Sequence, residues 1–274
     1  MSLDSLEVTA LTDVGNVRQY NEDSLAVDAD RGIVAVADGM GGHRAGEVAS
    51  RMAADLLLAG LARAADRFHP HARASGPAAA VVECIKRANR TIFEAGRADP
   101  RYRGMGTTVA AAVFYDDEAT LAHVGDSRIY RVRNGELTLL TRDDSLLRDQ
   151  VDLGVISAEE ARHSHNRSLV TRAVGVFESV TPHVQQESAQ PGDIYLVCSD
   201  GLNDLVEDTD IELIVSGLAA NLPLAAQVLV QAAKDNGGLD NVSVILVRVK
   251  APFPATPRSA LQRLAAWWRS LWSA

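Results

Sequence analysis

The sequence is organised around residues 33–43, which run Ile33-Val34-Ala35-Val36-Ala37-Asp38-Gly39-Met40-Gly41-Gly42-His43. Five apolar residues, three of them β-branched, predict a short buried strand that ends at a carboxylate. The glycines that follow let the backbone turn sharply and approach whatever the carboxylate holds. A bare aspartate at the end of a buried strand is costly, and a hard cation such as Mg²⁺ or Mn²⁺ would compensate its charge. On this stretch alone, a plain strand-to-turn connection explains the pattern equally well.

Length and composition place the chain among ordinary globular proteins. It has 274 residues, 47% hydrophobic and 23% charged, enough for one large domain or two small ones. Lys and Arg number 27 against 36 Asp and Glu, which gives a formal net charge of −9. This acidic surplus argues against a nucleic-acid-binding protein, which needs a basic face. It fits a site built from clustered carboxylates.

The cysteine count, the first ten residues and the length of the apolar runs further limit the class of protein. Cys84 and Cys198 are too few for a disulfide framework and lack the CxxC spacing of a zinc site. Residues 1–10 lack a basic segment followed by an apolar core, so we expect no signal peptide. No apolar run approaches the ~18 residues that cross a bilayer. We expect a soluble cytoplasmic protein.

Hydrophobic periodicity predicts strands in runs and helices in pairs. This arrangement is typical of the α+β class, with two packed antiparallel sheets and helices outside. The polar residues 143–168 contain short helical patterns and are expected to leave the sheet as an excursion. The predicted strands are residues 6–12, 24–28, 33–37, 107–115, 118–124, 128–133, 136–140, 194–198 and 242–249, and the predicted helices are residues 45–66, 78–97, 208–216 and 222–234.

Residues 251–274 differ in kind from the rest of the chain. Three prolines between Pro252 and Pro257 predict a stiff spacer, and apolar residues then recur at helical spacing with tryptophans and arginines. Such a basic amphipathic helix can lie on a membrane surface or dock on a partner. Packing on its own domain, or fraying, explains the same pattern.

Acidic residues recur at the ends of predicted strands, mostly beside a glycine or another small residue: Asp38, Asp126, Asp200, Asp240 and the pair Glu22-Asp23. One such residue is usually structural, but a set suggests that strand ends converge on one polar centre. Like charges so close would repel one another unless cations neutralised them. Two divalent metals ~3.5–4 Å apart can share a carboxylate and hold an acidified water that attacks phosphorus.

An arginine beside such metals would bind phosphate oxygens bidentately, and Arg18 is placed for that role. Together the motifs resemble those of the metal-dependent type 2C (PPM) serine/threonine protein phosphatases, in order and approximate spacing, over residues 6–249. The matching motifs are Arg18-Gln19-Tyr20-Asn21-Glu22-Asp23, Asp38-Gly39-Met40-Gly41-Gly42, Gly106-Thr107-Thr108, Gly125-Asp126-Ser127-Arg128, Ser199-Asp200-Gly201-Leu202 and Asp240-Asn241-Val242-Ser243.

The resemblance implies a four-layer α-β-β-α sandwich with a dinuclear Mn²⁺ or Mg²⁺ site at one edge of the central β-sandwich. By that resemblance, Asp38 looks like the ligand that bridges both metals, and Gly39 lends its carbonyl oxygen. Asp200 and Asp240 would bind one metal.

For the other metal the resemblance implies Glu22 or Asp23, directly or through water. Asp126 resembles the ligand of a third, weaker metal seen in bacterial members. Residues 143–168 match the flap near the active site, a place where substrates are selected.

Two departures from the family pattern affect the chemistry. Animal members have a histidine, thought to protonate the leaving group, at the position of Met40. A methionine here is usual in bacterial members. The nearby His43 is not assigned the histidine's role. Asp143-Asp144-Ser145 stands where bacterial relatives often carry Asp-His-Ser. The chain looks closest to stand-alone bacterial phosphatases that oppose Hanks-type kinases, including those associated with type VI secretion.

The leading hypothesis is a Mn²⁺- or Mg²⁺-dependent phosphatase formed by residues 1–250, which acts on phosphoserine and phosphothreonine in proteins without a covalent intermediate. Its expected partners are a Ser/Thr kinase and that kinase's substrates, with membrane-surface or partner contact through residues 251–274. The alternative is a pseudophosphatase, a phosphoprotein-binding scaffold on the same fold. A regulatory phosphatase of anti-sigma-factor antagonists is disfavoured because the chain has no room for a sensor domain, and a nuclease because of the −9 charge.

Overall fold

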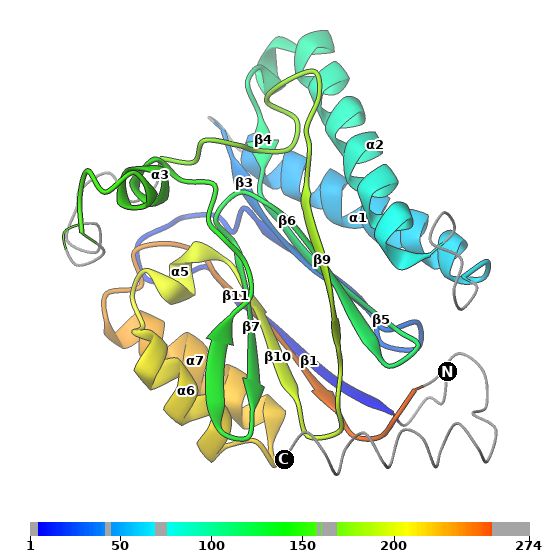
Figure 1. The fold of residues 1–274 in the computed structure, drawn as a ribbon. Coiled ribbons are helices and arrows are strands. Elements are labelled where there is room, and N and C mark those ends of the chain that lie inside the picture. The colour runs from blue at the N-terminus through cyan, green and yellow to red at the C-terminus, as the bar shows by residue number, and fades with distance from the viewer. Residues whose placement is uncertain (1–4, 42–44, 69–75, 158–159, 161–168, 254–274) are drawn as a thin grey trace.

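The computed structural model describes residues 5–41, 45–68, 76–157, 160 and 169–253. In this part of the chain, two antiparallel sheets pack face to face and a helix pair covers each outer face (Figure 1). The expected α+β class and the four-layer α-β-β-α order are confirmed. No helix among these residues has both the length and the apolar character needed to cross a bilayer.

The first sheet has the strand order β1-β11-β10-β7-β8, and every neighbouring pair is antiparallel. The second sheet has the order β2-β3-β5-β6-β9, and the short strand β4 pairs with the end of β3. The strands of the first sheet are β1 (Leu6–Asp13), β11 (Val242–Val249), β10 (Ile194–Cys198), β7 (Arg128–Arg133) and β8 (Glu136–Leu139). Those of the second are β2 (Asp23–Asp28), β3 (Ile33–Met40), β4 (Gly106–Thr107), β5 (Val109–Tyr115), β6 (Glu118–Val124) and β9 (His183–Ser188).

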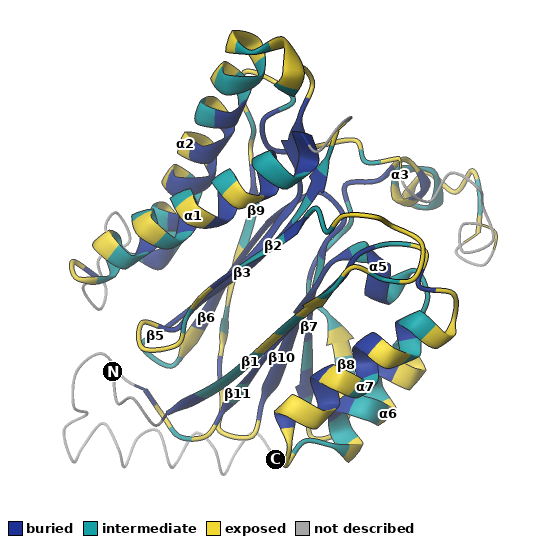
Figure 2. Cartoon of the chain, turned by 180° about the vertical axis from the view of Figure 1, so that it is seen from behind, coloured by how far each residue is buried: buried dark blue, intermediate teal, exposed yellow. Residues whose placement is uncertain are grey.

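Helices α1 (Ala45–Ala65) and α2 (Pro77–Ala98) pack on the second sheet, and α6 (Asp208–Gly217) and α7 (Leu222–Asp235) pack on the first. Figure 2 shows that the buried residues of these helices face the sheets. Shorter helices are η2 (Pro100–Tyr102), α3 (Leu146–Asp152) and α5 (Asp200–Asn203). Helix α7 begins where the Asn221 side chain accepts a hydrogen bond from the Leu224 backbone N–H, which satisfies one of the free donors at a helix start.

The four layers explain why the central strands are apolar at every position. In β3, Val34 and Val36 face the other sheet, whereas Ile33, Ala35 and Ala37 face α1 and α2. Because side chains alternate along a strand and both faces are covered, no position tolerates a polar residue until the strand reaches the edge. The same alternation in β10 sends Tyr195 and Val197 between the sheets and Leu196 toward α6 and α7.

Every predicted strand and long helix lies within a few residues of its predicted bounds. The sequence did not predict β9, whose residues HVQQES are mostly polar and half-exposed. This strand forms the outer edge of the second sheet by pairing with β6, so backbone pairing rather than a hydrophobic face defines it. Helix α3 lies in the predicted excursion, and most of residues 158–168 are outside the described residues, as is the tail beyond 253.

We expect the layer between the first sheet and its helices to be sensitive to truncation. Leu196 on β10 is fully buried there, so Leu196→Ala should lower the free energy of unfolding by about 2–5 kcal/mol through lost contacts and a cavity. Leu213 on α6 is 72% exposed, and Leu213→Ala should change it by less than about 0.5 kcal/mol. Urea unfolding of both variants checks this, and equal losses would contradict the assigned layers.

Candidate metal centre

Six acidic residues meet at one edge of the β-sandwich, and we refer to them as the acidic edge: Glu22, Asp23, Asp38, Asp126, Asp200 and Asp240. Asp23 and Asp38 lie directly opposite each other in the β2–β3 pair. Asp200 begins α5 just after β10, whereas Asp240 precedes β11, the neighbour of β10. Asp126 lies in the turn between β6 and β7. Antiparallel strands that alternate in direction thus bring the ends of β3 and β10 and the starts of β2 and β11 to the same edge (Figure 1).

The approach of α1 to β3 requires glycine on both sides. A Cβ on Gly39 would lie 2.1 Å from the Gly46 carbonyl oxygen and 2.7 Å from that of Glu22. A Cβ on Gly46 would in turn lie 2.9 Å from the Glu22 carboxylate. No real side chain fits such spaces, so the Asp38-Gly39 dipeptide is held tightly between the α1 start and the Glu22 backbone.

Backbone and hydroxyl contacts fix the position of Asp38. Its carbonyl oxygen accepts hydrogen bonds from the Thr108 N–H at 2.8 Å and the Thr107 hydroxyl at 2.8 Å. Its N–H donates to the Thr108 hydroxyl at 3.0 Å, which also contacts the Ser127 hydroxyl at 2.7 Å. The Gly106-Thr107-Thr108 and Gly125-Asp126-Ser127-Arg128 motifs therefore hold the aspartate backbone in place, a role that the sequence did not reveal.

Asn241 joins the N-terminal loop to the start of β11. Its side-chain oxygen accepts from the Glu22 N–H at 2.8 Å, and its amide donates to the Val14 and Tyr20 carbonyl oxygens at 3.0 Å each. The loop that carries Arg18 and Glu22 is thereby fixed beside Asp240.

Arg18 reaches across this junction to the acidic edge. Its Nη2 lies 2.6 Å from Asp240 Oδ2, and the ion pair raises the pKa of Arg18. The Arg18 side chain is 53% exposed, so the guanidinium remains accessible from solvent. A phosphate group that meets Arg18 would also meet the carboxylates beside it.

Burial and mutual repulsion raise the carboxyl pKa values along the acidic edge. Burial raises the pKa of Asp23 to about 6 and that of Asp126 to about 7, and neighbouring carboxylates add to both. The pKa of Asp38 is raised well above its usual range by burial and then by Asp23 and Asp200. Burial and the charges of Asp126, Asp204 and Asp240 raise that of Asp200. The protein alone therefore does not stabilise these carboxylates in their charged form.

Two buried carboxylate oxygens at this edge have no hydrogen-bond partner among the described residues. Asp23 Oδ2 accepts from the Ser199 hydroxyl at 2.8 Å, but Asp23 Oδ1 has no partner, and neither has Asp200 Oδ1. An unsatisfied buried oxygen of a carboxylate is expensive. Hard divalent cations bind such oxygens and restore the charged form, so the donor set fits Mg²⁺ or Mn²⁺.

The structure brings together every predicted acidic residue and Arg18. Met40 ends β3 opposite Gly106, whereas His43 is outside the described residues. Asp204, one turn after Asp200 in α5, was not predicted, although its charge raises the pKa values of Asp126 and Asp200. Its spacing of four from Asp200 was the available signal, because such residues share a helix face.

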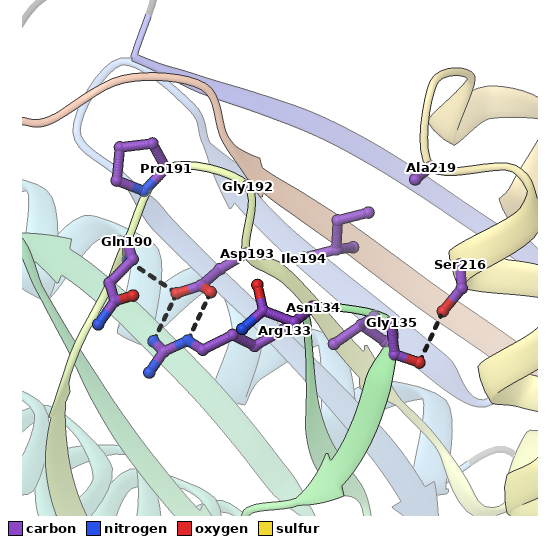
Figure 3. A pocket seen from close by; sticks show the side chains of 11 residues that line it. Arg133, Asn134, Gly135, Gln190, Pro191, Gly192, Asp193, Ile194, Ser216 and Ala219 are labelled. Atoms are coloured by element: carbon purple, nitrogen blue, oxygen red, sulfur yellow. Dashed lines mark hydrogen bonds and ion pairs between the residues drawn. The ribbon is translucent and has the colours of Figure 1, made fainter. Parts of the chain in front are cut away.

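A cavity of about 250 Å³ lies at the other end of the sandwich, between the β7–β8 turn and the loop before β10 (Figure 3). Its charged groups are already paired, because Arg133 binds the Asp193 carboxylate through two hydrogen bonds of 2.7 Å. Ser216 donates to the Gly135 carbonyl oxygen across the same cavity. It is therefore a weaker candidate site than the acidic edge.

Comparisons with known proteins identify relatives of the whole described fold. The family model for protein phosphatase 2C matches residues 16–232. The serine/threonine protein phosphatase PstP of Mycobacterium tuberculosis is 42% identical over 247 residues, which are 89% of this chain and 45% of PstP. The protein phosphatase PhpP of Streptococcus pneumoniae is 35% identical over 248 residues, covering 88% of this chain and 97% of PhpP.

A solved structure shares the fold as well as the sequence. The catalytic domain of PstP in complex with two manganese ions superposes with a TM-score of 0.78 at 37% identity, covering 90% of this chain and 99% of that one. The chain spans about half the length of the full PstP sequence that it matches.

We expect the metal-free protein to lose stability as pH rises because of the acidic edge. A carboxyl group whose pKa is higher in the folded than in the unfolded state stabilises the fold only while it is protonated. Asp126, with a pKa of about 7, should therefore destabilise the fold progressively between about pH 4 and pH 7. Relative to wild type in EDTA, Asp126→Asn should gain about 1–4 kcal/mol of unfolding free energy between pH 5 and pH 8.

Urea unfolding of wild type and of Asp126→Asn at pH 5 and pH 8 measures how the stability difference between the two proteins changes with pH. Saturating Mn²⁺ should shrink it, because a cation stabilises the ionised carboxylates that an asparagine cannot supply. A difference that is independent of pH in EDTA would contradict the assigned burial of Asp126.

Proposed function

The chain belongs to the protein phosphatase 2C family, and on that premise we propose that it hydrolyses phosphoserine and phosphothreonine in proteins in a Mn²⁺- or Mg²⁺-dependent reaction. The observation that carries the proposal is the acidic edge, where carboxylates with raised pKa values include two buried oxygens that have no hydrogen-bond partner in the described part of the chain. The named phosphatase relatives that it resembles add to this support, because PhpP is matched over 97% of its length.

Within the proposal, Asp38 would be a ligand of both metals, Gly39 would contribute its carbonyl oxygen, and Asp200 and Asp240 would hold one metal. Metals held there would supply an acidified water molecule and would offset negative charge on the phosphoryl oxygens. The chain's own task is to hold the ligands still, and the Thr107 and Thr108 contacts to Asp38 do this.

Asp23 and Glu22 are proposed to serve the second metal, and Asp126 a third and weaker one. Asp23 is the better placed of the first two to bind directly, because it lies opposite Asp38 and its Oδ1 has no hydrogen-bond partner among the described residues. Glu22 is half-buried beside Gly46 and Arg18, which favours a role through water. Burial in a shared cluster makes Asp126 depend on the same cations for its charge.

Arg18 is proposed to bind the phosphoryl group of the substrate. Its accessible guanidinium can bind two phosphate oxygens at once, while the ion pair with Asp240 orients it. Met40 has no ionisable proton, so the side chain at this position cannot act as the general acid.

We further propose that residues 143–168 select substrates beside this centre. Arg128 binds the Asp143 carboxylate with contacts of 3.0 and 2.7 Å, which fixes the start of the segment next to the Asp126 turn. A cavity of about 270 Å³ lies between α3 and the α5–α6 region, lined by Leu147, Val151 and Val206 together with charged groups. It offers a position for a substrate side chain near the phosphorylated residue.

The pseudophosphatase alternative lacks support. Such a protein usually loses a metal ligand, yet every acidic position predicted here is present and lies at the acidic edge. The relatives that match over nearly their whole length are named as phosphatases.

We expect Asp200→Asn to abolish the hydrolysis of a phosphothreonine peptide at every Mn²⁺ concentration, whereas wild-type activity should rise with Mn²⁺. The reason is that asparagine removes a charge from a cation site and leaves an uncharged amide. Asp38→Asn should behave in the same way. Either variant with full metal-dependent activity would refute the proposed ligand set.

Arg18→Ala is the matched contrast, because it should keep binding Mn²⁺ yet hydrolyse the peptide at a KM at least about tenfold higher. Calorimetric measurement of Mn²⁺ binding distinguishes the ligand variants Asp200→Asn and Asp38→Asn from Arg18→Ala. A wild-type protein that binds Mn²⁺ but shows no turnover would favour the scaffold alternative.

We propose that the chain opposes a Hanks-type kinase. A second partner proposal concerns the tail of residues 251–274. We propose that the phosphatase domain spans residues 1–250 in the cytoplasm, and that Trp267, Trp268 and Trp272 bring it to a membrane surface. The membrane proposal rests on the sequence pattern, because residues 254–274 of the tail lie outside the described residues.

A chain that ends at Phe253, and so keeps this buried ring in the core between the sheets, should therefore bind anionic liposomes at least about tenfold more weakly than the full chain, with unchanged peptide hydrolysis. Equal liposome binding by both chains would rule out the membrane role of the tail. If the full chain binds a partner protein and the shortened chain does not, the tail docks on a protein rather than on a membrane.

A further inference from the structure

Two histidines and an aspartate meet where β6 and β9 reach the excursion that starts at Asp143. His123 on β6 and His183 on β9 are directly opposite in the strand register, and their rings stack with centroids 4.8 Å apart. Asp144 joins them, so that one ligand atom from each of the three residues lies within 4.8 Å of the others. We refer to these three residues as the His-Asp-His cluster.

The outer polar atoms of the cluster are fixed by backbone groups. His123 Nε2 lies 2.8 Å from the Arg142 carbonyl oxygen, which only accepts, so this nitrogen carries the proton and Nδ1 carries the lone pair. Burial lowers the pKa of His123, which keeps the ring neutral. Asp144 Oδ2 accepts from the Gly125 N–H at 3.2 Å, which leaves Oδ1 for the cluster. Such outer contacts are typical of metal ligands.

The inner atoms already face one cation, because Arg172 Nη1 also lies 3.5 Å from Asp144 Oδ1 as an ion pair. His183 Nε2 lies 3.1 Å from Asp144 Oδ1 and 2.8 Å from Arg172 Nη1. One imidazole nitrogen carries either a proton or a lone pair, so it cannot donate to the carboxylate and accept from the guanidinium at once. A metal ion would satisfy both the lone pair and the carboxylate oxygen.

The surroundings allow an ion to enter and replace Arg172. Asp144 is buried, whereas the side chains of Arg172 and His183 are 50% and 39% exposed. A cavity of about 260 Å³, lined by both histidines, opens beside them. Ligand atoms at about 2.1 Å from a tetrahedral ion lie about 3.4 Å apart, so the exposed His183 ring must turn out of the stack and the ligand atoms must close by about 1 Å or more.

We propose that His123, Asp144 and His183 form a binding site for one Zn²⁺ ion, separate from the acidic edge. Two imidazoles and one carboxylate suit a borderline ion such as Zn²⁺, whereas Mg²⁺ prefers the all-oxygen donors of the acidic edge. The ion takes the place of the Arg172 guanidinium. Because the Asp144 backbone pairs with Gly125 and Thr171, the site joins both ends of the excursion to the sheet.

Zn²⁺ titration of the full chain in saturating Mg²⁺, against a chromophoric chelator, tests the proposal. Mg²⁺ occupies the oxygen sites, so we expect one Zn²⁺ per chain. His183→Ala should weaken this binding at least about tenfold. Arg172→Ala should strengthen it, because it removes the competing cation and leaves all three ligands.

Two control variants distinguish this site from other zinc binding. Asp200→Asn should retain the Zn²⁺ ion, because the acidic edge takes no part. A chain carrying both His69→Ala and His71→Ala, two histidines outside the described residues, should also retain it. With Co²⁺ in place of Zn²⁺, the visible d–d absorption of wild type should disappear in His183→Ala.

Absence of stoichiometric Zn²⁺ in wild type would overturn the proposal, as would equal affinity in His183→Ala. Loss of the ion in Asp200→Asn would assign it to the acidic edge, and weaker binding by Arg172→Ala would mean that the guanidinium does not compete. All these readouts measure binding, so they hold whether or not the chain is an active phosphatase. Thermal unfolding without Zn²⁺ confirms that each variant is folded.

Discussion

Repulsion among carboxylates held at one edge of the sandwich is the constraint on which the rest of this structure depends. Asp23, Asp38, Asp126 and Asp200 each lie among other acids, and each has a raised pKa. A fold that concentrates charge in this way gives up stability unless cations arrive. The large apolar layers behind the edge supply the stability that makes such a cluster tolerable.

The rigidity of the edge comes from contacts made by neutral groups. Thr107 and Thr108 hold the backbone of Asp38, while Asn241 fastens the loop before Glu22 to the start of β11. Gly201 is needed for the same reason, because a Cβ there would lie 2.0 Å from the Asn241 carbonyl oxygen. These residues bring charged ligands together without adding charge, so the ligands are preorganised before any cation binds.

The excursion that starts at Asp143 is attached through charged and imidazole groups rather than through an apolar core. Arg128 binds Asp143, and Asp144 contacts His183 and the Gly125 backbone. The same turn carries Asp126 of the acidic edge, so the two proposed metal sites adjoin one short segment of backbone. Whatever alters the charge at Asp144 therefore acts next to the proposed catalytic centre.

The sequence by itself determined the α+β class, the bounds of most strands and of the long helices to within a few residues, and the acidic residues at the strand ends. Strands covered on both faces must be apolar throughout, and an aspartate that ends such a run is conspicuous against that background. Only the tertiary structure decided which partners surround those acids. The threonine contacts and the His-Asp-His cluster depend on residues far apart in the chain, such as His123 and His183. Strand register decides which residues of two strands lie opposite each other. It is fixed by packing over whole sheets, so neither strand alone carries a local sequence signal for it.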